Sequence, residues 1–196
     1  MWTIKIKNDL KQISLIALLL IMPNLFQAQE FNLNNTESSL KVFGTSSLHD
    51  WHIDAENKNG KIVFKNIETG ELDKCDFTVV VESLKSGKKS MDKNTYKALN
   101  TDDYKTITFK LQEVKEIVKK GTGKFLIKSA GYLTITSVKK LIPIEFNIEI
   151  IEGKIILLGE KTIKMTDFNV EPPKALLGTI TTGDEVTIKF KTIFNK

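Results

Sequence analysis

The stretch that decides the fold covers residues 123–150 and reads G-K-F-L-I-K-S-A-G-Y-L-T-I-T-S-V-K-K-L-I-P-I-E-F-N-I-E-I. In its second half every other residue from Ile142 to Ile150 is apolar, and the residues between them are polar or proline. Side chains of a strand point to opposite faces with a period of two, so this half predicts a strand with one apolar and one solvent-facing side. The polar tetrad at residues 137–140 separates the halves, and the whole stretch therefore predicts a long hairpin.

The first half of this stretch carries an interruption on its apolar face. The alternation runs from Phe125 to Ile135, but it places Ser129 and Gly131 among the inward positions. Two small residues there leave a gap in the side-chain packing. Such a gap makes room for a ligand or marks a bend in the strand, and the pattern leaves both interpretations open.

The first 28 residues predict a secretory signal peptide rather than a part of the fold. Three lysines precede an apolar run at residues 13–22, Pro23 ends that run, and Ala28 supplies a small residue for cleavage. The run is shorter than the roughly 20 residues that a membrane-spanning helix needs. We therefore expect an exported protein with one domain at residues 29–196 and no transmembrane span in the mature chain.

Charge and cysteine usage narrow the function classes. All 29 basic residues are lysines, against 24 acidic residues. The chain thus lacks the planar arginine fork that favours phosphate and guanine recognition, and nucleic acid is not expected as a partner. Cys75 is the single cysteine and excludes an internal disulfide. We interpret Cys75 as a small residue at the entrance of a strand over residues 76–82.

The remaining pattern predicts an all-β protein of about eight strands. Alternation with a period of two indicates strands at residues 31–45, 60–64, 76–82, 107–111, 123–135, 142–150, 154–164 and 186–194. Closing such a sheet removes its edges, and eight strands enclose an interior that can hold one small ligand. A β-sandwich is the main alternative from the pattern alone.

Two segments depart from the strand pattern. Met91, Thr95 and Leu99 fall at helical spacing, which predicts one short helix near residues 90–100, with Ser90 as its cap and Asn100 at its end. Residues 165–182 lose the alternation and predict one long irregular loop.

Candidate catalytic and metal motifs are weak. His49 and His52 lie three apart, and in an extended segment they point to opposite faces, so we favour a role for Trp51 in lining or plugging one end of a barrel over a metal site. Ser90 and Lys93 match the S-x-x-K pattern of serine acylases, but the companion motifs of that class are absent. The sequence therefore predicts no catalytic residues, no metal and no cofactor.

Five segments in order resemble one known family. They are S-S-L-K-V-F-G-T-S-S-L-H-D-W (38–51), F-T-V-V-V-E-S-L-K-S-G (77–87), A-L-N-T-D-D-Y-K-T-I-T-F (98–109), G-Y-L-T-I-T-S-V-K-K-L-I-P-I (131–144) and L-G-E-K-T-I-K-M-T-D-F-N-V-E-P-P (158–173), the last followed by G-D-E-V-T-I-K-F (183–190). Together they span nearly all of residues 29–196. The chain resembles the YceI-like family, the lipocalin-like proteins of bacterial envelopes that bind polyisoprenoids or other lipids.

This resemblance implies an extended eight-stranded antiparallel lipocalin-like β-barrel in the bacterial periplasm or secreted, without catalysis. Its apolar pore would take a polyprenyl, quinone or fatty-acyl compound, and burial of the tail would drive binding at roughly 25 cal/mol per Å² of apolar area. Members of the family can form dimers, so a homodimer stays open. The expected ligand-binding residues face inward or come from the helix as a lid: Phe77, Val79, Val81, Met91, Tyr96, Leu99, Ile107, Phe109, Phe125, Ile127, Leu133, Ile144, Phe146 and Phe190.

Two other function classes remain open at this stage. The same inward residues would fill a solid core in a structural or stress-related envelope protein that binds nothing. A lipid-modifying enzyme would need polar groups inside the pore, and the inward pattern shows almost none. Lys88, Lys89 and Lys93 could meet an anionic head group, although a solvated basic loop is the favoured interpretation.

Overall fold

The computed structural model describes residues 29–196 and builds them almost entirely from antiparallel strands. The predicted signal peptide at residues 1–28 lies outside the described residues. The strands are β1 (Gln29–Leu33), β2 (Ser39–Ser46), β3 (Trp51–Ala55), β4 (Lys58–Asn66), β5 (Glu71–Val80), β6 (Leu84–Lys85), β7 (Thr106–Gly121), β8 (Lys124–Ile135), β9 (Val138–Ile151), β10 (Lys154–Lys164), β11 (Lys174–Ala175) and β12 (Ile180–Asn195). Residues 29–196 also contain one α-helix, α2 (Lys89–Ala98), and three 3₁₀ turns, η1 (Val81–Ser83), η2 (Thr166–Phe168) and η3 (Leu176–Gly178).

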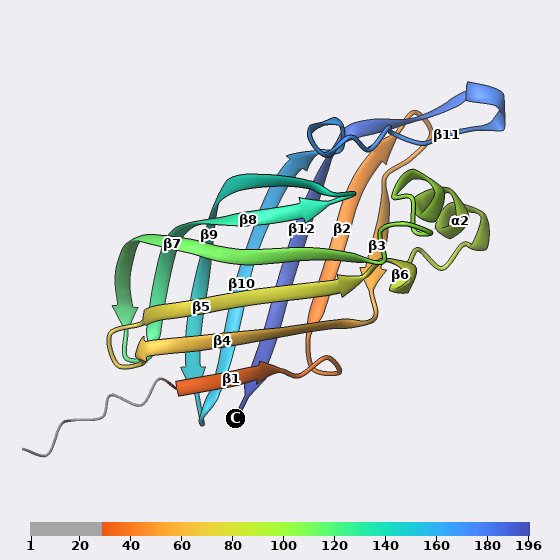
Figure 1. The fold of residues 1–196 in the computed structure, drawn as a ribbon. Helices are drawn as coiled ribbons and strands as arrows, with labels where there is room; N and C mark the ends of the chain where they lie inside the picture. The colour runs from red at the N-terminus through yellow and green to blue at the C-terminus, as the bar shows by residue number, and fades with distance from the viewer. Residues whose placement is uncertain (1–28) are drawn as a thin grey trace, which may run out of the picture.

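Eight of these strands close into a barrel. The ladder runs β4-β5-β7-β8-β9-β10-β12, and β1 pairs with both β12 and β4. In Figure 1, β4, β5 and β7 cross in front of β9, β10 and β12 at a steep angle, so the barrel is flattened into two crossing layers. The closed barrel predicted from the sequence is therefore confirmed, and the β-sandwich alternative is excluded because β1 joins the two layers at their free edge.

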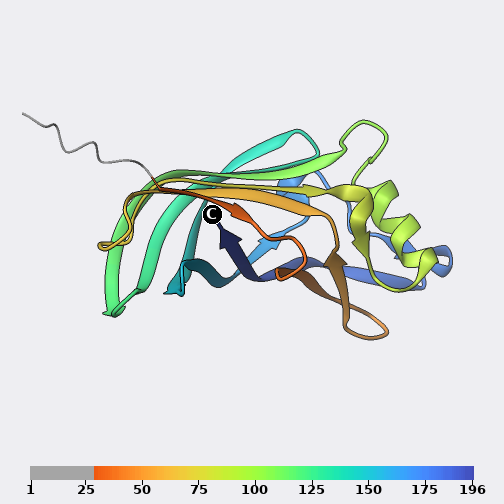
Figure 2. The same ribbon diagram turned by 90° about the horizontal axis from the view of Figure 1, so that it is seen from below.

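A short ribbon extends one end of the barrel. It continues from β12 through β2 and β3 to β6. Figures 1 and 2 both place α2 beside β6 at this end. The opposite end is packed solid by buried side chains whose exposed fractions do not exceed 5%: Phe31, Ile62, Phe64, Leu72, Phe125, Ile127, Ile148, Ile155 and Phe194. Cys75, Phe146 and Leu157 belong to the same buried cluster and lie between the packed end and the cavity described below.

The hairpin of residues 123–150 forms as predicted, with a tighter turn. β8 and β9 pair from Ile135↔Val138 to Lys124↔Glu149. The turn consists of Thr136 and Ser137, both with positive φ (44° and 67°), so the prediction of a turn over residues 137–140 was too long. Two-residue turns of this left-handed kind match the right-handed twist of the flanking strands.

Other predicted boundaries need correction. β5 begins at Glu71, so Cys75 lies inside this strand and not at its entrance. The helix starts one residue before Ser90, and its N-cap position is Lys88, without a side-chain cap, so Ser90 does not cap it. Asn100 does follow the helix with a positive φ of 46°, as its predicted place at the helix end requires.

The segment at residues 165–182 is ordered by specific contacts and is not one irregular loop. Backbone N–H and Oγ1 of Thr166 donate hydrogen bonds to the Asp184 carboxylate at 2.9 and 2.7 Å, and these bonds lower the pKa of Asp184. Phe168 and Val170 are buried against Leu133 and other residues of the barrel end. The last strand also begins earlier than predicted, at Ile180.

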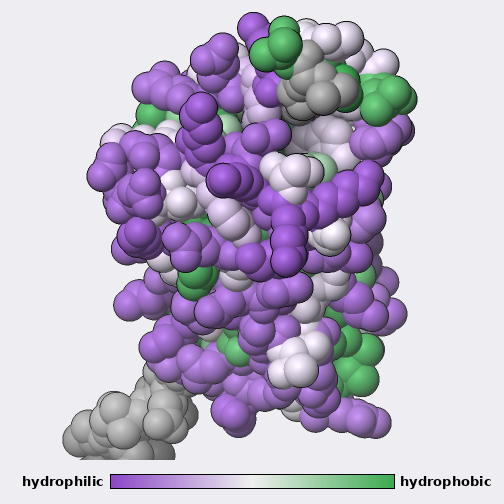
Figure 3. Space-filling view, turned by 90° about the vertical axis from the view of Figure 1, so that its right-hand side faces the viewer, coloured by the Kyte–Doolittle hydropathy of each residue, from purple (hydrophilic) through white to green (hydrophobic). Residues whose placement is uncertain are grey.

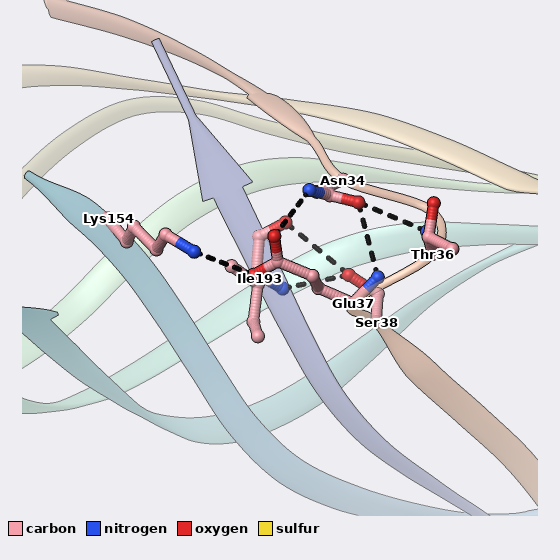
Figure 4. Close-up of polar contacts among 6 residues, drawn as sticks. All are labelled: Asn34, Thr36, Glu37, Ser38, Lys154 and Ile193. Atoms are coloured by element: carbon pink, nitrogen blue, oxygen red, sulfur yellow. Dashed lines mark hydrogen bonds and ion pairs between the residues drawn. The ribbon is translucent and has the colours of Figure 1, made fainter.

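The turn between β1 and β2 fastens the closing strand. The Asn34 side chain accepts hydrogen bonds from the backbone N–H groups of Thr36 and Glu37 at 3.1 and 3.2 Å, which is an Asx turn. The Ser38 hydroxyl accepts the Ile193 N–H at 2.9 Å, and Glu37 pairs with Lys154 at 2.8 Å (Figure 4). The Ser38 hydroxyl thus replaces a backbone carbonyl as the hydrogen-bond acceptor for β12, at the point where the partner of β12 changes from β1 to β2.

Replacing Ser38 with Ala should destabilise the barrel by about 1–3 kcal/mol, because the partly buried Ile193 N–H loses its acceptor. Urea unfolding followed by circular dichroism measures this change. Thr36→Ala, in the same turn but exposed and bonded only through its backbone, is the control and should stay within about 0.5 kcal/mol of the parent protein. Equal unfolding midpoints for the two variants would contradict the role assigned to Ser38.

The Cys75 thiol should be unreactive in the folded protein. It is 1% exposed, and its burial, with a smaller contribution from the Asp76 carboxylate, raises its pKa to about 12. The thiolate is the reactive form, so alkylation by iodoacetamide at pH 8 should be on the order of 1,000-fold slower in the native state than in urea. Mass spectrometry of timed samples measures both rates, and rapid modification of folded protein would show that this position is open to solvent.

Candidate functional site

The candidate site is a cavity of about 400 Å³ inside the barrel at the end that carries α2. Pockets of roughly 300–1,000 Å³ are typical of sites for small molecules and cofactors. The inner faces of β2, β3, β5, β7, β8, β9, β10 and β12 form its wall, and α2 and residues 165–174 contribute to its rim. Nearly all of the wall side chains are aliphatic or aromatic.

Side-chain exposure shows where the barrel changes from solid to hollow. Ile127 and Ile148, in the packed end, are 0% exposed. Phe109, Ile144 and Phe190 occupy equivalent inward positions nearer to α2, yet they are only partly buried. Since these three side chains line the cavity, the surface that they leave uncovered faces the interior. The barrel is therefore packed at one end and open inside at the other.

Aromatic rings contact the wall where the neighbouring strand has a glycine. The Phe109 ring occupies the space that a Cβ of Gly131 would need. The Phe190 ring approaches Gly159 in the same way, where a Cβ would come within 2.6 Å of its Cζ atom. The gap expected at Gly131 is thus filled by the tip of an aromatic ring.

The second small residue of that gap has a separate role. Ser129 is 2% exposed, and its hydroxyl donates a hydrogen bond to the Ile144 carbonyl at 3.1 Å. The inward hydroxyl is therefore satisfied within the β8–β9 hairpin. It offers no free polar group to a ligand.

The helix α2 covers the open end with one face. Met91, Thr95 and Leu99 line the cavity. Tyr96 lies on the other side, where its hydroxyl accepts a hydrogen bond from Lys85 at 2.6 Å and is 2.8 Å from the Glu82 carbonyl. Tyr96 consequently holds the helix against β6 and does not line the cavity.

A second contact fixes the start of the helix. The Ser86 N–H and Oγ donate to the Asp92 carboxylate at 2.7 and 2.6 Å. Partial burial of this carboxylate opposes ionisation, but the two hydrogen bonds outweigh it and lower the pKa of Asp92. The loop before α2 is thus tied to the first turn of the helix at neutral pH.

Ten of the fourteen sequence-predicted site residues line the cavity, and four do not. The ten are Phe77, Val79, Met91, Leu99, Ile107, Phe109, Leu133, Ile144, Phe146 and Phe190. Phe125 and Ile127 belong to the packed end of the barrel. Val81 is buried in a separate hydrophobic cluster with Ile53 and Leu84, and Tyr96 anchors the helix. Alternation identified the inward face correctly, but it carries no information on how far along the barrel the packing extends.

Several lining residues were missed by the sequence analysis. They come mainly from the ribbon and from the last two long strands: Leu40, Val42, Ile53, Lys161, Ile163, Val186 and Ile188. Their inward positions follow from the same alternation. Lys161 stands out because it continues the inward series Ile155, Leu157 and Gly159 on β10.

The polar side chains of the cavity are few, and no carboxylate lines it. Its basic side chains are His49, Lys88, Lys161 and Lys174. Trp51 lines the cavity, as expected, and its Nε1 donates to the Thr45 carbonyl at 2.9 Å. His52 lies instead against the Phe43 ring, with a centroid separation of 5.9 Å. Within residues 29–196 no cluster of three or more His, Cys, Asp or Glu side chains could hold a metal ion.

Over the described part of the chain, no helix has the length and apolar character needed to cross a membrane.

Comparison with known proteins agrees with this architecture. The model of the YceI-like domain matches residues 31–194. Burkholderia cenocepacia BcnA superposes with a TM-score of 0.67 at 18% identity, covering 82% of this chain and 98% of that one. A polyisoprenoid binding domain from Saccharophagus degradans, implicated in plant cell wall breakdown, gives 0.67 at 15% identity, covering 84% and 97%.

The YceI protein of Campylobacter jejuni gives a TM-score of 0.59 at 21% identity, covering 74% of this chain and 84% of that one. No curated protein sequence matches the chain. At these identities the solved structures establish the fold alone, whereas the domain model covers nearly the whole described chain. The protein belongs to the YceI-like family.

Proposed function

We propose that the protein binds one long-chain amphiphile in the barrel cavity and performs no chemistry on it. Candidate ligands are polyprenyl, quinone and fatty-acyl compounds. The observation that carries the proposal is that the inward apolar side chains near α2 are only partly buried, because a cavity of about 400 Å³ separates them. Apolar side chains that face the interior without packing against one another favour binding of a ligand whose apolar tail can contact them.

Burial of the ligand tail would supply the binding free energy. Each Å² of apolar surface removed from water contributes roughly 25 cal/mol before the costs of association. The cavity wall is rigid because its strands are paired on both sides over most of their length, so little ordering of the protein is needed. Met91 and Leu99 of α2 would lie over the entering chain as a lid.

A structural relative supports the same ligand class. The Saccharophagus degradans neighbour is described as a polyisoprenoid binding domain. Together with the cavity, this description favours a lipid or isoprenoid ligand over the other classes.

The two competing functions fit the cavity less well. A structural barrel without a ligand would be expected to fill its interior, as this barrel does around Phe125 and Ile127. A lipid-modifying enzyme would need an acid–base pair facing the substrate, and the cavity wall offers lysines and a histidine without a carboxylate. A binding protein without catalysis is the simplest function for this wall.

The proposal includes export to a bacterial envelope compartment. Its support is the leader pattern at residues 1–28 together with the family, whose members are envelope proteins. Cleavage near Ala28 would make Gln29, the first residue of β1, the new N-terminus. Pairing of two chains stays open and can be determined in the same measurement as the ligand.

Protein purified from its own cells should retain its bound ligand under the conditions of native mass spectrometry. Native mass spectrometry should show a mass excess that disappears on organic extraction, and the extract should contain a quinone, polyprenyl or long-chain acyl compound. The same spectra distinguish monomer from dimer. A mass equal to that of the bare polypeptide, with no rise in melting temperature on adding isoprenoids, would contradict the binding function.

Filling the cavity should abolish ligand uptake. Ile144 lines the cavity, so the larger side chain of Ile144→Trp should occupy the space that the ligand tail needs and leave little or no bound ligand. Leu141→Trp is the matched control, because Leu141 lies on the outer face of the same strand and is 51% exposed. Native mass spectrometry of both variants measures the bound fraction, and equal ligand loads would show that the cavity is not the binding site.

A further inference from the structure

Lys161 is a charged side chain on the inner wall of the barrel. It follows the inward positions of Ile155, Leu157 and Gly159 on β10, of which Ile155 and Leu157 are 0% and 1% exposed. In the ladder Lys161 lies opposite Ile188 of β12, and Ile188 lies opposite Val42 of β2. Leu157, Ile188 and Val42 line the cavity together with Lys161, and all three are apolar.

The Lys161 ammonium has no partner among the described residues. Ten ion pairs are present in residues 29–196, and none includes Lys161. Among the same residues its Nζ donates no hydrogen bond, and none of their carboxylates lines the cavity. On the outer face of the same strand pair, by contrast, Lys189 meets Glu160 at 3.4 Å. The protein thus neutralises an outward lysine next to the one that it leaves unpaired inside.

The position of Lys161 differs from that of the other bases around the cavity. His49, Lys88 and Lys174 are exposed, whereas Lys161 is partly buried. It lies four residues from Leu157, at the inner end of the cavity, and four from Met165, at its rim. At about 3.3 Å per strand residue, these positions are roughly 13 Å away along the chain in each direction. Lys161 therefore lies midway along the wall.

An unpaired ammonium in apolar surroundings is costly, and an anion beside it recovers much of that cost through a charge-assisted hydrogen bond. We infer that Lys161 receives the anionic head group, a carboxylate or a phosphate, of the amphiphile bound in the cavity. This inference rests on the proposed function and narrows it, because a ligand with a neutral head would leave the ammonium unpaired. The tail then covers the apolar wall around the head group.

Three ligands with one tail test the head-group preference: dodecanoic acid, dodecyl phosphate and dodecanol. Calorimetric titration of delipidated protein at neutral pH should give at least one anionic ligand about tenfold or more tighter binding than the alcohol, which is the range for hydrogen bonds to charged groups. The acid and the phosphate arms show which anion is preferred. Equal affinities for all three ligands would overturn the assignment while leaving amphiphile binding intact.

Substitution of the lysine separates its role from general packing. Lys161→Gln should lose the preference for the anion, roughly tenfold or more in affinity, and keep the affinity for dodecanol. Lys161→Arg should retain most of the preference. Lys164→Gln removes the same charge from an exposed position on the same strand and should behave as the parent protein does.

Two further results would count against the inference. If Lys161→Gln weakened the acid and the alcohol equally, the side chain would contribute packing and not charge recognition. If the parent protein bound none of the three ligands, the proposed function itself would fail, a result clearly different from binding that ignores the head group.

Discussion

The fold depends on β1, a strand of five residues that pairs on both sides. Four of its residues pair with β4, and its last two pair with the end of β12. Without this strand the sheet would keep two free edges, which expose unpaired backbone groups and invite pairing with other chains. The Asx turn that follows β1 and the Ser38 hydroxyl fix the point where this seam ends. A short segment therefore converts two crossing layers into a closed barrel with an inside.

Closure creates an interior, and side-chain size decides how much of it is filled. Phenylalanines 31, 64, 125 and 194 meet at one end and leave no space. Towards α2 the aromatic residues are placed differently, because Phe109 and Phe190 contact glycines of neighbouring strands. One barrel thus combines a solid end, which contributes stability through apolar burial, with a hollow end that encloses the cavity.

The site consists of an apolar wall, and most of its polar groups lie outside that wall or at its rim. The wall is continuous and apolar, the helix α2 covers it without being buried, and the hydrogen bonds of Tyr96 and Asp92 hold the helix from outside. Within this apolar wall the single inward lysine, Lys161, is the exception, because nearly every other polar group of the cavity lies at the rim or is hydrogen-bonded to the backbone. The chemistry suited to such a wall is recognition of an amphiphile by its tail and its head.

The sequence by itself determined the strand pattern and the inward face, because residues such as Ile142, Ile144 and Phe146 alternate with polar residues with a period of two. That pattern left a β-sandwich open, and the barrel class followed from the family resemblance. The sequence also contained the inward position of Lys161 in the alternation of residues 155–163. Only the tertiary structure decided that Ile127 is packed solid while Ile144 faces a cavity, and that Tyr96 turns away from the ligand site. These outcomes depend on which side chains from distant strands meet at one level of the barrel, and on rings such as Phe109 finding a glycine across the ladder. Such contacts join residues far apart in the chain, where a local pattern carries no information.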